Sequence, residues 1–146
     1  MTLSSPSNAT LGNNNVHTYV INDNENAPSI GFNLISSSND ESVASQSIDV
    51  NLSSVSSKNI TVNYSATGTA TGSGTDYNLA NGTLTINPGE VNGTITITDI
   101  VDDSLDEANE TVIITLSSPT NASLGTDIVH TLSLIHISEP TRQSLI

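Results

Sequence analysis

The 146-residue chain lacks cysteine and tryptophan, has one phenylalanine and three tyrosines, and is poor in cations. The absence of cysteine excludes a disulfide framework, a thiolate metal site and a cysteine nucleophile. Two basic residues, Lys58 and Arg142, stand against 15 Asp and Glu, so the formal net charge is −13. Nucleic acids and anionic lipid surfaces both require clustered Lys or Arg, and binding to either is therefore excluded. No apolar run approaches the ~18 residues of a membrane span, so no direct membrane insertion is expected.

Small polar residues dominate instead, chiefly Ser, Thr, Asn and Gly, and charged residues make up 12% of the chain. This profile is typical of many short strands joined by tight turns, and it is common in secreted repeat proteins. Hydrophobic residues make up 34%, which is low, but they are patterned: Ile60–Tyr64 and Thr94–Thr98 alternate apolar and polar side chains. Alternation of this kind indicates half-buried strands, so a folded domain is expected rather than disorder.

Short β-rich runs bounded by turn residues predict the secondary structure, and no helix-length amphipathic period is present. About seven strands between Ser29 and Leu134, with a turn about every ten residues, predict an all-β fold built as an antiparallel β-sandwich. The expected strands are Val16–Ile21, Ser29–Leu34, Ile48–Leu52, Ile60–Ala66, Thr83–Ile86, Thr94–Ile100, Thr111–Ser117 and Ile128–Leu134.

An internal repeat divides the chain. Leu3–Gly12 recurs as Leu116–Gly125, and Val16–Thr18 recurs as Val129–Thr131 at the same offset. The chain is therefore interpreted as part of a tandem array. Residues 1–21 are predicted to be the C-terminal hairpin of a preceding, truncated unit, residues 22–27 an acidic linker, and residues 28–135 a full domain. A hairpin without its sheet is expected to be poorly packed.

The end of the chain departs from the repeat. The match stops at Leu132, and residues 136–146 are predicted to be a tail outside the domain. The run from Leu132 to Arg142 resembles translated sequencing-adaptor DNA, which would make it a sequence artefact. The alternative is an ordinary final strand and tail. No function is assigned to residues after Thr131.

Six of the 15 carboxylates fall between Asp99 and Glu110, and no Lys or Arg lies near them in sequence. Like charges repel at close range, so such a loop is either well solvated or holds a cation. Ca²⁺ suits the second case because it takes 6–8 oxygen ligands in a flexible shell, whereas Zn²⁺ favours His or Cys. The six residues are Asp99, Asp102, Asp103, Asp106, Glu107 and Glu110.

Strand order adds carboxylates from other loops to this cluster. When successive strands alternate in direction, alternate loops emerge at the same end of a sandwich. The loop with Asp40 and Glu41, the loop with Asp76 and the acidic loop are alternate loops, so they are expected at one pole. The other pole is left with only Glu90 and Asp127.

Several short motifs along the chain together match one known family. They are Val62–Tyr64, Gly68–Ala70, Gly74–Tyr77, Gly82–Ile86, Pro88–Glu90, Ile100–Asp103, Glu107, Glu110 and Leu116–Pro119. With these motifs the chain resembles the Calx-beta domain, a repeat found in sodium–calcium exchangers, an integrin β subunit and large microbial surface proteins. The similarity covers about Pro28 to Thr131 and again Leu3 to Glu25.

The resemblance implies an immunoglobulin-like sandwich that binds Ca²⁺ at one pole. Its ligand positions fall on Asp76, Asp102, Asp103 and Glu107, and more loosely on Glu41. Two departures imply an incomplete site. The family places acidic residues directly after the last strand, where this chain has Ile135, His136 and Ile137, and Ser104 stands where some members have a further Asp.

Three functions remain open. The first is a calcium-binding structural or adhesion module of an extracellular or cell-surface repeat protein, whose parent is a candidate for membrane anchoring and whose partners are calcium and neighbouring repeats. The second is a metal-free spacer whose acidic loop is only a solvated turn. The third is a regulatory calcium-sensing domain of a membrane transporter. An enzyme is not expected, because no nucleophile arrangement is recognisable and Tyr77 is the only aromatic residue expected at the pole where the carboxylates gather.

Overall fold

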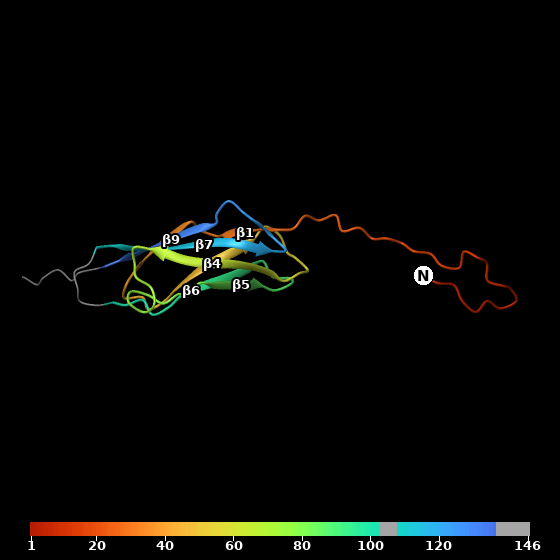
Figure 1. The fold of residues 1–146 in the computed structure, drawn as a ribbon, viewed down its shortest axis with the longest axis horizontal. Helices are drawn as coiled ribbons and strands as arrows, with labels where there is room; N and C mark the ends of the chain where they lie inside the picture. Colours follow the sequence, from red (N-terminus) through yellow and green to blue (C-terminus); the bar gives the residue numbers. More distant parts are fainter. Residues whose placement is uncertain (103–107, 137–146) are drawn as a thin grey trace, which may run out of the picture.

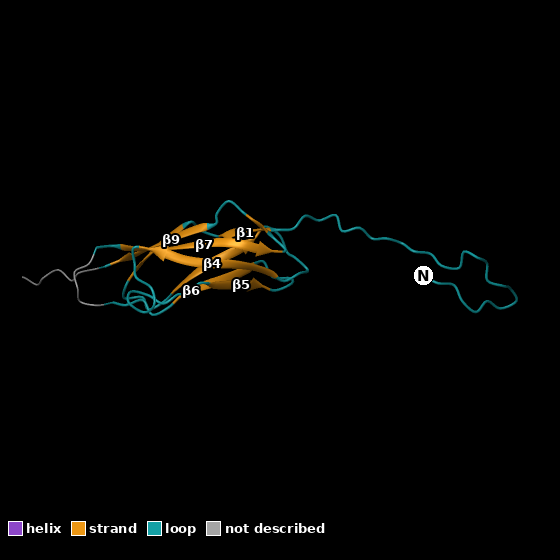
Figure 2. Ribbon diagram, viewed as in Figure 1, coloured by secondary structure: helices purple, strands orange, loops and turns teal. Residues whose placement is uncertain are grey.

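Nine strands and no helix make up the computed structural model, which describes residues 1–102 and 108–136 (Figures 1 and 2). No helix long and apolar enough to cross a membrane therefore occurs in these described ranges. The strands are β1 (Ser29–Phe32), β2 (Ser36–Asp40), β3 (Gln46–Leu52), β4 (Ile60–Gly68), β5 (Gly82–Ile86), β6 (Asn92–Ile97), β7 (Glu110–Thr120), β8 (Ser123–Leu124) and β9 (Val129–Ile135).

The strands form two sheets that pack face to face. One sheet has the order β6-β3-β1-β8, and the other has the order β2-β9-β7-β4-β5. The prediction of an all-β, immunoglobulin-like sandwich is confirmed. Neighbouring strands in each sheet run antiparallel, apart from two parallel pairs, β1 with β8 and β2 with β9.

Alternation of side chains explains the core. On β7, Val112, Ile114 and Leu116 are almost fully buried, and the residues between them are half-buried on the opposite face. This is the period of two that places successive side chains on opposite faces of a strand. The same pattern runs along the other long strands. The buried apolar residues are Ile30, Phe32, Ile48, Val50, Leu52, Ile60, Val62, Ala70, Tyr77, Ile86, Ile95, Ile97, Ile100, Val112, Ile114, Leu116, Leu132 and Leu134.

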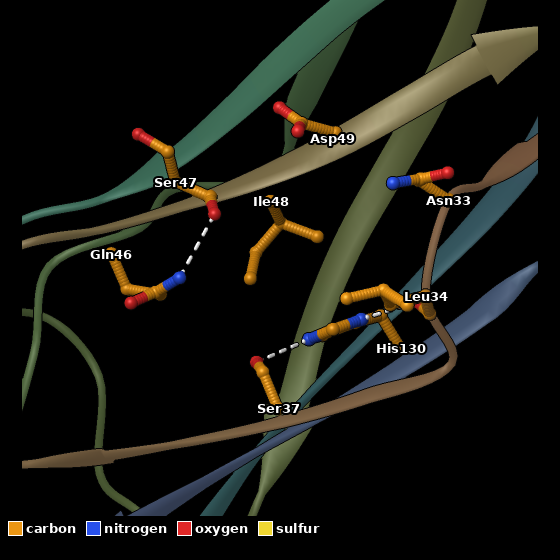
Figure 3. A pocket seen from close by; sticks show the side chains of 8 residues that line it. All are labelled: Asn33, Leu34, Ser37, Gln46, Ser47, Ile48, Asp49 and His130. Atoms are coloured by element: carbon orange, nitrogen blue, oxygen red, sulfur yellow. Dashed lines mark hydrogen bonds between the residues drawn. The ribbon is translucent and has the colours of Figure 1, made fainter.

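The first strand of the domain changes sheets. The strand predicted over Ser29–Leu34 corresponds to β1, but β2 lies in the segment predicted as a loop and belongs to the other sheet. His130 on β9 holds the crossover, because its Nδ1 lies 2.6 Å from the Leu34 carbonyl oxygen and its Nε2 lies 2.8 Å from Ser37 Oγ (Figure 3). A carbonyl oxygen only accepts hydrogen bonds, so Nδ1 donates. This buried histidine is structural, and the small cavity beside it measures about 70 Å³.

Other expected boundaries also differ. The predicted strand over Val16–Ile21 is wrong, because the N-terminal segment forms only an isolated bridge between Thr2 and Val16. The strand predicted over Thr94–Ile100 ends at Ile97, since Asp99 takes a left-handed φ of 51° that an extended strand does not allow. Asp40 was expected in a loop and is the last residue of β2.

Candidate metal centre

One end of the sandwich gathers carboxylates from separate loops. We call this end the acidic pole and define it by Glu41, Asp76, Asp102 and His136, which lie in the segments that follow β2, β4, β6 and β9. Glu41 comes directly after β2, and His136 comes directly after β9. Because β2 and β9 are parallel neighbours, their ends meet at the same edge of the sheet.

Backbone hydrogen bonds tie these segments together. The amide of Val101 donates to the carbonyl of Asp76 over 3.0 Å. The segment that contains Asp102 therefore lies against the loop that contains Asp76. The amide of Ile100 donates to the Ala44 carbonyl over 3.1 Å, and the amide of Glu41 donates to the Ile135 carbonyl over 3.4 Å. Asp76 and Asp102 therefore lie at the same end of the molecule, as the alternation of loops predicted.

Asp76 is positioned by its own loop. Its Oδ2 accepts a hydrogen bond from the amide of Thr71 over 2.6 Å, and its side chain is half-buried. The next residue, Tyr77, is 3% exposed and belongs to the core. A core anchor directly after the carboxylate fixes where the backbone of Asp76 lies.

The same neighbours perturb the Tyr77 phenol. Burial raises the pKa of Tyr77 above its usual value of 10.0, and the negative charge of Asp76 raises the pKa further.

Alkaline titration is expected to expose this shift. Because the folded state raises the Tyr77 pKa, it favours the protonated phenol, and the resulting stabilisation is present below pH 10 and lost as the pH rises through the folded-state value. We expect unfolding midpoints in urea to fall over that alkaline range. Tyr77→Phe has no proton to lose, so a fall of the same size in that variant would contradict the assignment.

Glu41 has a partner that the sequence did not reveal. Its Oε2 lies 2.7 Å from Nδ1 of His136, and the two side chains are only 8% and 4% exposed. A carboxylate oxygen accepts and the imidazole Nδ1–H donates. Oε2 of Glu41 is thus already hydrogen-bonded to a nitrogen donor. Calcium binds oxygen ligands, so it would require this same oxygen.

The ligand chemistry at the acidic pole fits calcium in part. Glu41, Asp76 and Asp102 supply only oxygen donors, which suits Ca²⁺. However, within residues 1–102 and 108–136 no group of three or more His, Cys, Asp or Glu side chains lies close enough together to hold a metal ion. A complete site therefore requires carboxylates from outside these ranges. Asp103 and Glu107, the two remaining predicted ligands, lie outside the described residues.

The repeat indicates the change at position 136, although not its contact with Glu41. The offset that carries Leu3 to Leu116 also carries Asp23 to His136, so His136 stands where Asp23 follows the first copy of the repeat. An aspartate would add a carboxylate to the acidic pole, whereas histidine adds a nitrogen donor. The role of the five predicted residues as ligands stays a prediction.

Comparison with known proteins identifies the family of this domain. A family model described as the Calx-beta domain matches residues 23–137. No match is found among curated proteins.

Several solved structures share the architecture. The apo form of the Calx CBD1 domain is 23% identical, with a TM-score of 0.68, over 75% of this chain and 97% of the other. CBD12 of CALX1.1, named as a calcium binding domain, is also 23% identical with a TM-score of 0.68, but this chain spans only 46% of it. The Calx CBD2 domain is 16% identical with a TM-score of 0.65, over 78% of this chain and 87% of the other. At such identities the likeness shows the fold alone.

Proposed function

Because the chain belongs to the Calx-beta domain family, we propose that it is a calcium-binding structural module of an extracellular or cell-surface protein built from tandem repeats. The supporting observation is the acidic pole, where a backbone hydrogen bond of 3.0 Å brings the Asp102 segment against Asp76. The calcium binding named for CBD12 of CALX1.1 agrees with this proposal.

The proposed ligands are Asp76, Asp102, Asp103 and Glu107, with Glu41 as a looser member. When bound, calcium supplies positive charge that relieves the repulsion among these carboxylates and cross-links their loops. The protein's part is to present the oxygens from a fixed frame. Tyr77 anchors the Asp76 loop in the core, and the bond from the amide of Ile100 to Ala44 anchors the segment before Asp102.

The proposed role is non-catalytic, and the proposed location is outside the cell. It is supported by the recurrence of Leu3–Gly12 as Leu116–Gly125, by the abundance of small polar residues, and by the high net negative charge. A role in adhesion would come from neighbouring units held in a defined arrangement, with calcium stiffening each joint. Asp23 and Glu25 in the linker supply carboxylates directly after the first repeat copy, where a preceding unit would end.

Calcium titration tests the proposal directly. We expect heat of binding by calorimetry with a dissociation constant on the order of 10⁻⁴ to 10⁻³ M, the range of extracellular calcium modules. At a calcium concentration of about 100 times the dissociation constant, the folded state should gain ~2.7 kcal/mol, visible as a higher melting temperature. No heat and no melting shift up to ~10 mM calcium would end the metal proposal for this chain.

A double variant separates the module from a metal-free spacer. Asp102→Asn with Asp103→Asn should abolish the calcium-dependent rise in melting temperature, because it removes two proposed ligands. In a spacer the same change only relieves repulsion, so stability without calcium rises and calcium has no effect in either protein. Asp49→Asn with Asp127→Asn is the matched control, because it removes the same charge from exposed positions away from the acidic pole.

A further inference from the structure

The N-terminal segment copies the backbone of the last hairpin of the sandwich. Thr2 pairs with Val16, and Thr115 pairs with Val129, which are the equivalent two positions in the second copy of the repeat. The amide of Leu3 donates to the Asn15 carbonyl over 2.8 Å, and at the equivalent positions the amide of Leu116 donates to the Ile128 carbonyl over 2.8 Å. The two segments therefore share a hydrogen-bond register as well as a sequence.

The unusual backbone angles also coincide. Ser5 and Asn8 take left-handed φ values of 50° and 56°, and Ser118 and Asn121 take 47° and 59°. In the sandwich, Ser118 lies where the pairing of β7 with β4 shifts register, which is the mark of a β-bulge. Ser5 adopts the bulge conformation although none of the nine described strands pairs with it. A non-glycine residue rarely adopts this conformation. The backbone of the segment therefore already has the conformation that pairing with a partner strand requires.

The two hairpins differ in burial. Leu3 is 60% exposed whereas Leu116 is 1% exposed, and Ile21 is 85% exposed whereas Leu134 is fully buried. His17 is exposed, while its counterpart His130 is 2% exposed and contacts Leu34 and Ser37 (Figure 3). In Figure 1 the segment extends away from the sandwich, which agrees with the exposure of Leu3 and Ile21.

We propose that residues 1–21 are a preformed closing hairpin whose partner is a second sandwich body of this fold, made of strands equivalent to β1–β6. The inference rests on the tandem arrangement in the proposed function, and it is independent of calcium. Docking would bury the side chains of Leu3, His17 and Ile21 as Leu116, His130 and Leu134 are buried.

The described sandwich shows which surfaces the partner must offer. β7 pairs antiparallel with β4, so the first arm of the hairpin needs a strand like β4 whose edge accommodates the bulge. β9 pairs parallel with β2, so the second arm needs a strand like β2. Leu11 corresponds to Leu124 on β8, which pairs with β1. Three strands of one body meet these needs together, whereas an isolated sheet edge offers only one of them.

The partner can be built from the chain itself. Residues 24–113 are placed before Met1, so that Ile113 precedes Met1 as it precedes Ile114 in the described sandwich. Hydrogen exchange in EDTA then compares the extended chain with the chain as it stands. The amides of Leu3 and His17 already donate within the hairpin, to Asn15 and Met1. We expect them to exchange at least about tenfold more slowly in the extended chain, because packing in a sandwich keeps the hairpin from opening. EDTA removes calcium, so the result does not depend on whether the chain binds calcium.

Paired substitutions provide the control. Leu3→Asp should lower the melting temperature of the extended chain and leave that of the chain as it stands unchanged, since Leu3 is exposed there. Leu116→Asp should destabilise the chain as it stands, because it buries a charge in the core. Equal exchange of the Leu3 and His17 amides in both chains would overturn the proposal. Slower exchange that depends on protein concentration would also overturn it, because the hairpin would then bind another copy instead.

Discussion

In calorimetric titrations, His136→Asp is expected to bind calcium at least about tenfold more tightly than the unmodified chain. The change installs the residue found at the equivalent position after the first repeat copy, Asp23. It removes the imidazole that lies 2.7 Å from Glu41 Oε2 and adds a carboxylate to the acidic pole. Calcium affinity in proteins rises with the number of charged oxygen ligands, so both effects act in the same direction.

The same variant should be less stable without calcium. Two nearly buried carboxylates would then face each other with no donor between them, which is unfavourable. His136→Gln is the control, because it removes the imidazole and adds no charge. Calcium binding by His136→Asp that is no tighter than binding by His136→Gln would show that position 136 contributes no ligand.

Gly68→Ala is expected to destabilise the fold by about 3 kcal/mol or more. Gly68 ends β4 with a φ of +133°, and an added Cβ would lie 2.0 Å from the carbonyl oxygen of Thr111 on β7. Backbone atoms of paired strands cannot move aside as a flexible side chain can. We expect a lower urea midpoint, because relief of the overlap requires β4 and β7 to separate at the acidic pole.

Gly74→Ala provides the comparison for that result. Gly74 has a φ of +84°, but no atom lies within 4 Å of the position of its added Cβ. Both variants force alanine into a left-handed conformation, and only Gly68→Ala adds the overlap with Thr111. Equal losses of stability in the two variants would mean that the backbone relaxes around Gly68 and that the contact with Thr111 costs little.

Long strands with a clear period were predictable from sequence. On β4, Ile60, Val62 and Tyr64 alternate with polar residues because one face packs in the core, and this alternation is local information. The alternation of loops then placed Asp76 and Asp102 at one end without any knowledge of side-chain contacts.

Features set by distant contacts were not predictable. The crossover from β1 to β2 depends on His130, which lies far along the chain from Leu34. β8 has only two residues and exists because β1 lies beside it, so it leaves no periodic signal. The pairing of Glu41 with His136 joins residues 95 positions apart in the chain, and no local pattern encodes it.

The parallel pairing of β2 with β9 also has a mechanical consequence. The chain enters β1 at one pole and leaves β9 at the other, and β2 follows β1 in the same direction. Tension applied between the two ends therefore acts along the strands, and it loads the five paired positions from Ser36–Thr131 to Asp40–Ile135 in shear. Hydrogen bonds sheared as a group must break together, whereas those of a hairpin peeled from its tip break in succession. A string of such units would resist stretching at every sandwich, leaving the linkers to extend first.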